Sequence, residues 1–127
     1  MAPRSILICD DEVELADELS EYLSGVGWQV RVVTSGHDAE DVLQRGAAPH
    51  CLLTDLRILD YDGARLVALA RSLPLDRRPA VISVMTGHLD DGVSAAEIGA
   101  DAIFFKPIDG ESLSNELLDR VERADVR

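Results

Sequence analysis

Five short apolar runs, each followed by a polar turn and an amphipathic segment, constrain the fold of this chain more than any other feature. The runs are rich in Val, Ile, Leu and Phe and indicate strands buried on both faces; they span residues 6–9, 30–33, 51–53, 80–85 and 102–105. Apolar residues at helical spacing predict helices around residues 13–23, 37–45, 64–73, 95–98 and 113–121. Strands that alternate with helices predict right-handed βαβ units. We therefore expect an α/β fold with a five-stranded, doubly wound parallel sheet.

Length and charge narrow the range of functions. A chain of 127 residues suits a single domain, so we expect one domain over residues 1–127 and no effector domain in this chain. The 24 acidic residues against 12 basic ones leave a net charge of −12, which disfavours direct contact with nucleic acid or an anionic membrane.

Apolar runs and cysteines indicate a cytoplasmic protein. We find neither a run of about 18 apolar residues, as a membrane helix needs, nor a secretory signal. Cys9 and Cys51 lie in apolar runs, so we expect two buried free thiols in a reducing compartment. His37, His50 and His88 are expected on the polar surface, and Trp28 is expected to be a partly buried packing residue.

Charged and hydroxyl side chains follow four of the five expected strands. The first ends in Asp10-Asp11, the third in Asp55, the fourth in Thr86 and the fifth in Lys106. The carboxyl ends of parallel strands meet at one edge of a sheet, where ligands of doubly wound folds bind. Grouped carboxylates suit a hard cation such as Mg²⁺, and a carboxylate can attack phosphorus as a nucleophile. The set therefore predicts phosphoryl transfer to a carboxylate, with the lysine pairing the transferred charge.

The motifs ILICDDE, CLLTDL, DYDG, VMTGH and GADAIFFKP occur in this order and resemble those of the receiver domains of bacterial two-component response regulators, the family of the chemotaxis regulator. The resemblance covers about residues 5–124 and implies a (βα)5, flavodoxin-like receiver fold. It implies a signalling domain that promotes its own phosphorylation and dephosphorylation and is not a turnover enzyme. The phosphoryl group would come from a histidine kinase or a phosphotransfer protein.

The resemblance also assigns roles residue by residue. Asp55 would be the phospho-acceptor, and Mg²⁺ (or Mn²⁺) would be held by Asp10, Asp11, Asp55 and the main-chain carbonyl of Arg57. Thr86 would be the switch hydroxyl, and Lys106 would bind a phosphoryl oxygen. The lifetime of the phosphoryl group would be tuned by Arg57 and His88, which flank the reaction path. The output would be a contact with an unidentified downstream protein, and the sequence leaves dimerisation open.

Three features depart from the usual receiver pattern. Ile103 stands where an aromatic side chain often reorients, so an aromatic rotamer switch is absent there. Leu59 replaces a usual proline in the turn after the acceptor, which removes a constraint on φ. Either this loop is more mobile or the Leu59 side chain packs there, and we favour packing. The segment from Thr86 to Lys106 is about two residues shorter than in typical receivers, which places the standard dimer arrangement in doubt.

Three alternatives remain open at this stage. The first is a receiver-like binding module that signals without phosphorylation, which Ile103 and the short segment favour mildly. The second is a phosphatase with an aspartate nucleophile, but such enzymes place a second acid where this chain has Arg57. The third is a flavin-binding domain, but the Asp10-Asp11-Glu12 run would repel a phosphate after the first strand.

Overall fold

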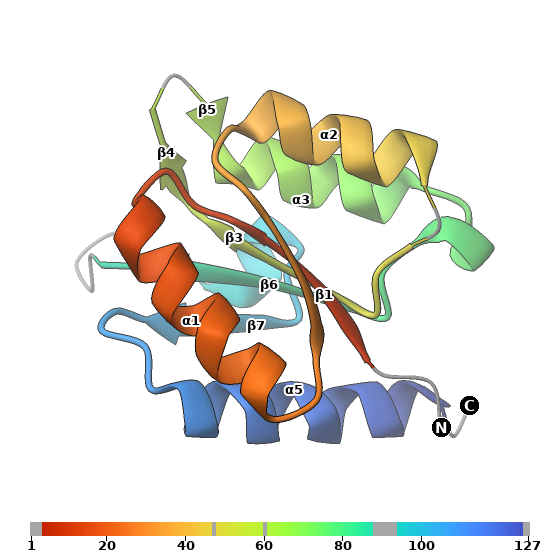
Figure 1. Ribbon diagram of the computed structural model, residues 1–127. Helices are drawn as coiled ribbons and strands as arrows, with labels where there is room; N and C mark the ends of the chain where they lie inside the picture. The colour runs from red at the N-terminus through yellow and green to blue at the C-terminus, as the bar shows by residue number, and fades with distance from the viewer. Residues whose placement is uncertain (1–3, 47, 60, 88–93, 126–127) are drawn as a thin grey trace.

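A five-stranded parallel sheet lies between two layers of helices in the computed structural model, which describes residues 4–46, 48–59, 61–87 and 94–125 (Figure 1). The strand order is β2-β1-β3-β6-β7, and every pair is parallel. This confirms the predicted doubly wound sheet. The strands are β1 (Ser5–Cys9), β2 (Gln29–Val33), β3 (Cys51–Asp55), β6 (Val81–Thr86) and β7 (Ala102–Phe105).

The helices divide into two layers, so the sheet has a core on each face (Figure 1). One face packs against α1 and α5, through side chains such as Leu19 and Leu117. The other packs against α2, α3 and α4, through side chains such as Leu43 and Leu66. The helices are α1 (Val13–Gly25), α2 (Gly36–Arg45), α3 (Gly63–Ser72), α4 (Ala95–Ile98) and α5 (Gly110–Asp125), with a short 3₁₀ turn at Leu75–Arg77.

Side-chain oxygens start four of these helices. Ser35 accepts a hydrogen bond from the amide of Asp38 at α2, and Asp62 accepts one from the amide of Ala64 at α3. Ser94 accepts one from an amide in the first turn of α4. At α5, Asp109 Oδ2 accepts a hydrogen bond from the amide of Ser112 over 3.1 Å. Each bond satisfies an amide that has no partner within its own helix, so the local sequence determines where these helices begin.

Burial differs between the inner and the outer strands. The inner strands β1, β3 and β6 are buried along almost their whole length, as the apolar runs predict. In β2 every residue is at least partly exposed, and β7 ends in the half-exposed Phe105. The expectation of burial on both faces is therefore wrong for β2 and β7. As edge strands, they have a neighbouring strand on one side only, and the helix layers cover them incompletely.

A two-stranded antiparallel ribbon follows the third strand of the main sheet. It pairs β4 (Arg57–Ile58) with β5 (Tyr61–Asp62), and the sequence patterns did not predict it. Gly63 then brings the chain back against β3, because its amide donates to the carbonyl of Leu56 over 2.9 Å. A Cβ at Gly63 would lie 2.2 Å from the carbonyl oxygen of Asp55, so this approach requires glycine.

Several single residues lie where the sequence placed them, and one does not. Trp28 is buried, and its indole N–H donates to the hydroxyl of Ser114 on α5 over 2.9 Å. Cys9 and Cys51 are buried free thiols, as expected. His50 is half-buried rather than on the open surface, because its Nδ1 lies 3.0 Å from the amide nitrogen of Ser5. Within the described ranges, no helix has the length and apolar character that crossing a membrane requires.

Candidate phosphoryl-acceptor and metal site

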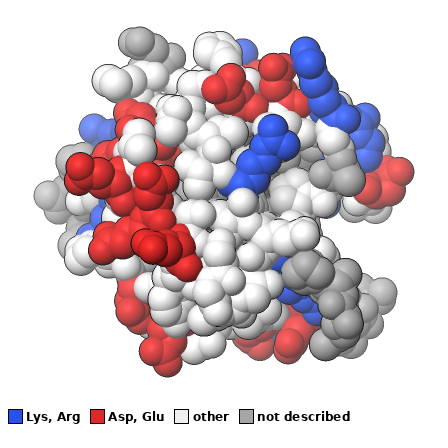
Figure 2. Space-filling view, in the orientation of Figure 1, with Lys and Arg blue, Asp and Glu red and all other residues white. Residues whose placement is uncertain are grey.

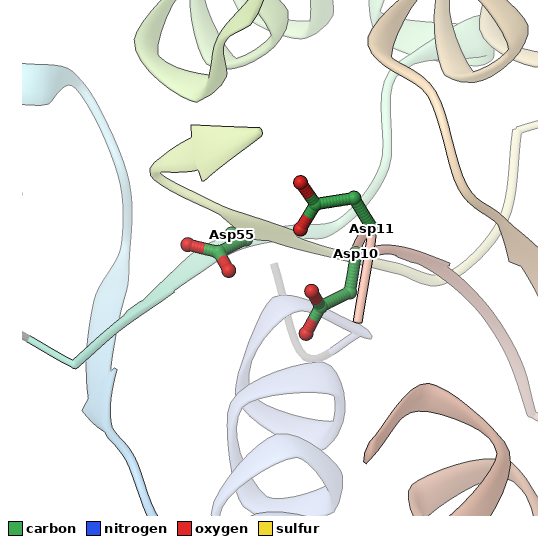
Figure 3. A group of neighbouring side chains, drawn as sticks. All are labelled: Asp10, Asp11 and Asp55. Carbon is green, nitrogen blue, oxygen red and sulfur yellow. The ribbon is translucent and has the colours of Figure 1, made fainter. Parts of the chain in front are cut away.

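Three carboxylates converge at the carboxyl edge of the sheet (Figure 3). Asp10 and Asp11 directly follow β1, and Asp55 is the last residue of β3, the neighbouring strand. One ligand oxygen from each residue lies within 4.8 Å of the others. The parallel pairing of β1 with β3 therefore brings together acids that are far apart in the sequence.

Lys106 enters this cluster from β7, two strands away from Asp55. Its Nζ donates to Asp55 Oδ2 over 2.7 Å and to Glu12 Oε1 over 3.1 Å, and it lies 3.3 Å from Asp10 Oδ2. Burial alone would lower the pKa of this ammonium group, but its hydrogen bonds to Asp55 and Glu12 outweigh that effect and raise the pKa. These hydrogen bonds thus stabilise the protonated, charged form of Lys106. The peptide bond to Pro107 is cis.

Asp10 is the most buried of the three acids, with an exposed fraction of 0%. Its Oδ1 accepts a hydrogen bond from the amide of Glu12 over 2.9 Å. Its Oδ2 has no hydrogen-bond partner among the described residues, and the ammonium of Lys106 lies at ion-pair distance without hydrogen-bond geometry. Burial raises the pKa of Asp10, against the lowering effects of the Glu12 amide and Lys106. The negative charge on the buried Oδ2 of Asp10 is therefore only partly balanced by Lys106.

Both carboxylate oxygens of Asp55 accept hydrogen bonds. Oδ1 accepts from the amide of Arg57 over 3.0 Å, and Oδ2 accepts from Lys106. Only 5% of Asp55 is exposed. Asp11 is half-buried, and its Oδ2 accepts a hydrogen bond from the amide of Leu59 over 3.0 Å. Backbone amides of the segment after β3 thus orient two of the three carboxylates.

The structure describes three of the four remaining predicted site residues. Thr86 ends β6 and is buried, and its carbonyl accepts from the amide of Lys106 over 2.9 Å. Ile103 is half-buried and packs against the core beneath α3 and α4. Arg57 is exposed at the start of β4. His88 lies outside the described residues, as does part of the short segment between Thr86 and α4.

The donor set fits a hard divalent cation. The carboxylates of Asp10, Asp11 and Asp55 offer oxygen ligands only, which Mg²⁺ prefers. The Oδ2 of Asp10, which has no hydrogen-bond partner among the described residues, is an atom that a cation would satisfy. Repulsion among three neighbouring carboxylates, of which Lys106 pairs with Asp10 and Asp55, also favours added positive charge.

Two functional groups at this site were missed by the sequence interpretation. Glu12 shares the ammonium of Lys106 with Asp55 and Asp10. Its position directly after Asp10 and Asp11 in the sequence could have indicated this role. The amide of Leu59 holds Asp11, and no sequence pattern indicates a backbone donor. The expected packing of Leu59 is wrong, because 80% of the residue is exposed.

A model of the response regulator receiver domain matches residues 6–118. The chain belongs to this family. It is 35% identical over 120 residues to the transcriptional regulatory protein GltR of Pseudomonas aeruginosa, which covers 94% of this chain and 48% of that protein. It is 30% identical over 122 residues to the photosynthetic apparatus regulatory protein RegA of Rhodobacter capsulatus, which covers 94% of this chain and 64% of RegA. The chain thus spans about half to two thirds of the length of these two curated relatives.

Solved structures agree with this assignment. A CheY-like receiver domain from Methylobacillus flagellatus superposes with a TM-score of 0.79 at 29% identity, over 93% of this chain and 98% of that one. The receiver family therefore accounts for the five-stranded parallel sheet of this chain.

Proposed function

We propose that this receiver domain accepts a phosphoryl group on Asp55 from a histidine kinase or a phosphotransfer protein, in the presence of Mg²⁺ or Mn²⁺. The observation that supports this most is the contact of 2.7 Å between Lys106 Nζ and Asp55 Oδ2, next to the carboxylates of Asp10 and Asp11. A buried acid with an ammonium group on one oxygen and neighbouring oxygen ligands can accept a phosphoryl group and stabilise its charge.

The transfer step follows from these positions. An oxygen of Asp55 attacks phosphorus, the bond from phosphorus to the donor imidazole nitrogen breaks, and that nitrogen keeps the electron pair. The ammonium group of Lys106, which pairs with Asp55 before the transfer, then pairs with a phosphoryl oxygen. A divalent cation held by Asp10, Asp11, Asp55 and the carbonyl of Arg57 would neutralise charge on the transferred group.

The output would begin at Thr86 and Ile103. The hydroxyl of Thr86 is a donor at the end of β6, one strand from Asp55, and would turn toward a phosphoryl oxygen. Ile103 packs against the helices on that side, so a shift of the strand ends would reach the surface without an aromatic rotamer change. The surface altered in this way would bind a downstream protein.

The surface supports a protein partner rather than nucleic acid. Acidic side chains gather over α1, next to the site (Figure 2). The exposed acids of this helix and its start are Glu12, Glu14, Asp17, Glu18 and Glu21. Such a surface repels a phosphate backbone. We therefore propose a cytoplasmic signalling domain that does not itself bind DNA, although some of its longer relatives are transcriptional regulators.

Mass measurement after incubation with acetyl phosphate and Mg²⁺ tests this function. One phosphoryl group is expected on the parent chain and none on Asp55→Asn, because the amide is a poor nucleophile. Glu14→Gln is the matched control, since it removes one exposed acid outside the cluster. Equal labelling of Asp55→Asn and the parent contradicts the assignment, and an unlabelled parent favours a module that signals without phosphorylation.

A further inference from the structure

The amide of Leu59 makes a contact that its side chain does not explain. Its N–H donates to Asp11 Oδ2 over 3.0 Å, across 48 positions of sequence. The residue is 80% exposed, so the side chain contributes little packing there. The feature that the structure uses at this position is therefore the backbone donor. Proline has no N–H and could not supply it.

This hydrogen bond connects two ligand-bearing segments. Asp11 lies between β1 and α1, and Leu59 directly follows β4, whose first residue is Arg57. A carboxylate has about four lone-pair positions on its two oxygens. A donor on Oδ2 therefore leaves positions for a cation, while it restricts rotation of the side chain.

We propose that the backbone amide of Leu59 positions Asp11 for metal binding, by holding its carboxylate in the orientation that faces Asp10 and Asp55. The inference rests on the proposed metal site, and it concerns a positioning group rather than a ligand. The hydrogen bond remains when the cation binds. Its role is to remove the cost of ordering the Asp11 side chain at the moment of binding.

Two substitutions at one position separate the amide from the side chain. Leu59→Pro removes the N–H, and Leu59→Ala keeps it while removing an exposed side chain. The extended backbone before a proline suits Ile58, which already lies in a strand. Magnesium dissociation constants are measured for the parent chain and both variants from the shifts of backbone amide resonances near Asp11.

The proline variant is expected to bind Mg²⁺ about threefold to tenfold more weakly than the parent, which corresponds to the cost of ordering one side chain at the moment of binding. The alanine variant is expected to stay within about twofold of the parent, since it keeps the hydrogen bond. Equal or tighter binding by Leu59→Pro overturns the proposal. If the parent itself shows no Mg²⁺-dependent shift, the proposed metal site fails as well, so the two failures are distinguishable.

Amide hydrogen exchange in the parent tests the same hydrogen bond without a substitution. The Leu59 amide belongs to an exposed residue and would exchange rapidly without a partner. Slow exchange in the metal-free protein, retained in excess Mg²⁺, supports positioning. Protection that disappears when Mg²⁺ is added overturns the proposal, because the cation would then displace the donor from Asp11.

Discussion

The Nζ of Lys106 lies 2.7 Å from Oδ2 of Asp55, although 51 positions separate the two residues. Lys106 is the only lysine of the chain, whose other basic residues are arginines. Because β6 lies between β3 and β7, the side chain of Lys106 passes the carboxyl end of β6 to reach Asp55. One ammonium group thus partners three acids: Asp55, Glu12 and Asp10.

Lys106→Gln is expected to lower the free energy of unfolding in the absence of metal by about 1–3 kcal/mol, since it leaves buried carboxylates without their charged partner. Added Mg²⁺ should recover part of this loss. Arg45→Gln is the control, because the ion pair of Arg45 with Asp41 is largely exposed and contributes little. Urea unfolding followed by the fluorescence of the single tryptophan, Trp28, measures both. Equal losses in the two variants would contradict this account.

The thermal midpoint is expected to rise with Mg²⁺ concentration in the parent chain. A cation relieves repulsion among carboxylates that are held together only in the folded state, so it binds that state preferentially. Asp11→Ala should abolish this rise, whereas Glu14→Ala, on the exposed face of α1, should preserve it. Scanning calorimetry with and without Mg²⁺ decides the matter, and an undiminished response in Asp11→Ala would speak against the metal site.

The aspartyl phosphate is expected to last longer in the parent than in a variant that combines Arg57→Ala with His88→Ala. These nitrogen-bearing side chains, two positions after Asp55 and Thr86, would hinder the attacking water or pair with the phosphoryl group. Loss of phosphate over time is followed by mass measurement after removal of the donor. Arg65→Ala, at an exposed position of α3, is the control. The lifetime hypothesis fails when the double variant loses phosphate no faster than the parent.

Stability is expected to fall as the pH rises above about 9. Burial raises the pKa of Cys9 to about 11 and that of Cys51 to about 12, from an ordinary value of 9.0. In this range the unfolded thiols lose protons that the folded ones keep, so the unfolded state becomes more favourable. Burial and the hydrogen bond to Glu40 also raise the pKa of Tyr61, which acts in the same direction at higher pH.

Urea unfolding between about pH 8 and about pH 10.5 measures this slope, in a range that spans the ordinary thiol pKa. Cys51→Ala should reduce the slope, although the smaller side chain also lowers stability at every pH. A variant with an unreduced slope would show that the buried thiol is not its source.

Gly63→Ala is expected to destabilise the chain and to impair phosphorylation of Asp55. Its new Cβ would lie 2.2 Å from the carbonyl oxygen of Asp55, so the backbone of the acceptor would have to move, at a cost of about 1–3 kcal/mol. Gly25→Ala is the matched control, because no atom beyond its chain neighbours and its own helix backbone lies within 4 Å of its Cβ position. Unfolding in urea and labelling by acetyl phosphate are compared, and similar behaviour of the two variants would contradict the steric argument.

The sequence by itself determined the sheet and most of the acidic edge. Apolar runs and helical spacing are local signals, and they indicate β1, β3 and β6 because these strands are buried on both faces. Once a parallel sheet is assumed, residues that end its strands must share one edge. This rule was sufficient to group Asp10, Asp11, Asp55, Thr86 and Lys106.

Only the tertiary structure decided which donor holds which oxygen. The amide of Leu59 on Asp11 and the shared ammonium between Glu12 and Asp55 depend on how loops distant in sequence meet. A backbone N–H is present in every residue but proline, so no residue type marks it in advance. The exposure of Leu59 likewise follows from where the ribbon of β4 and β5 lies, because an apolar side chain is buried only where other elements pack against it.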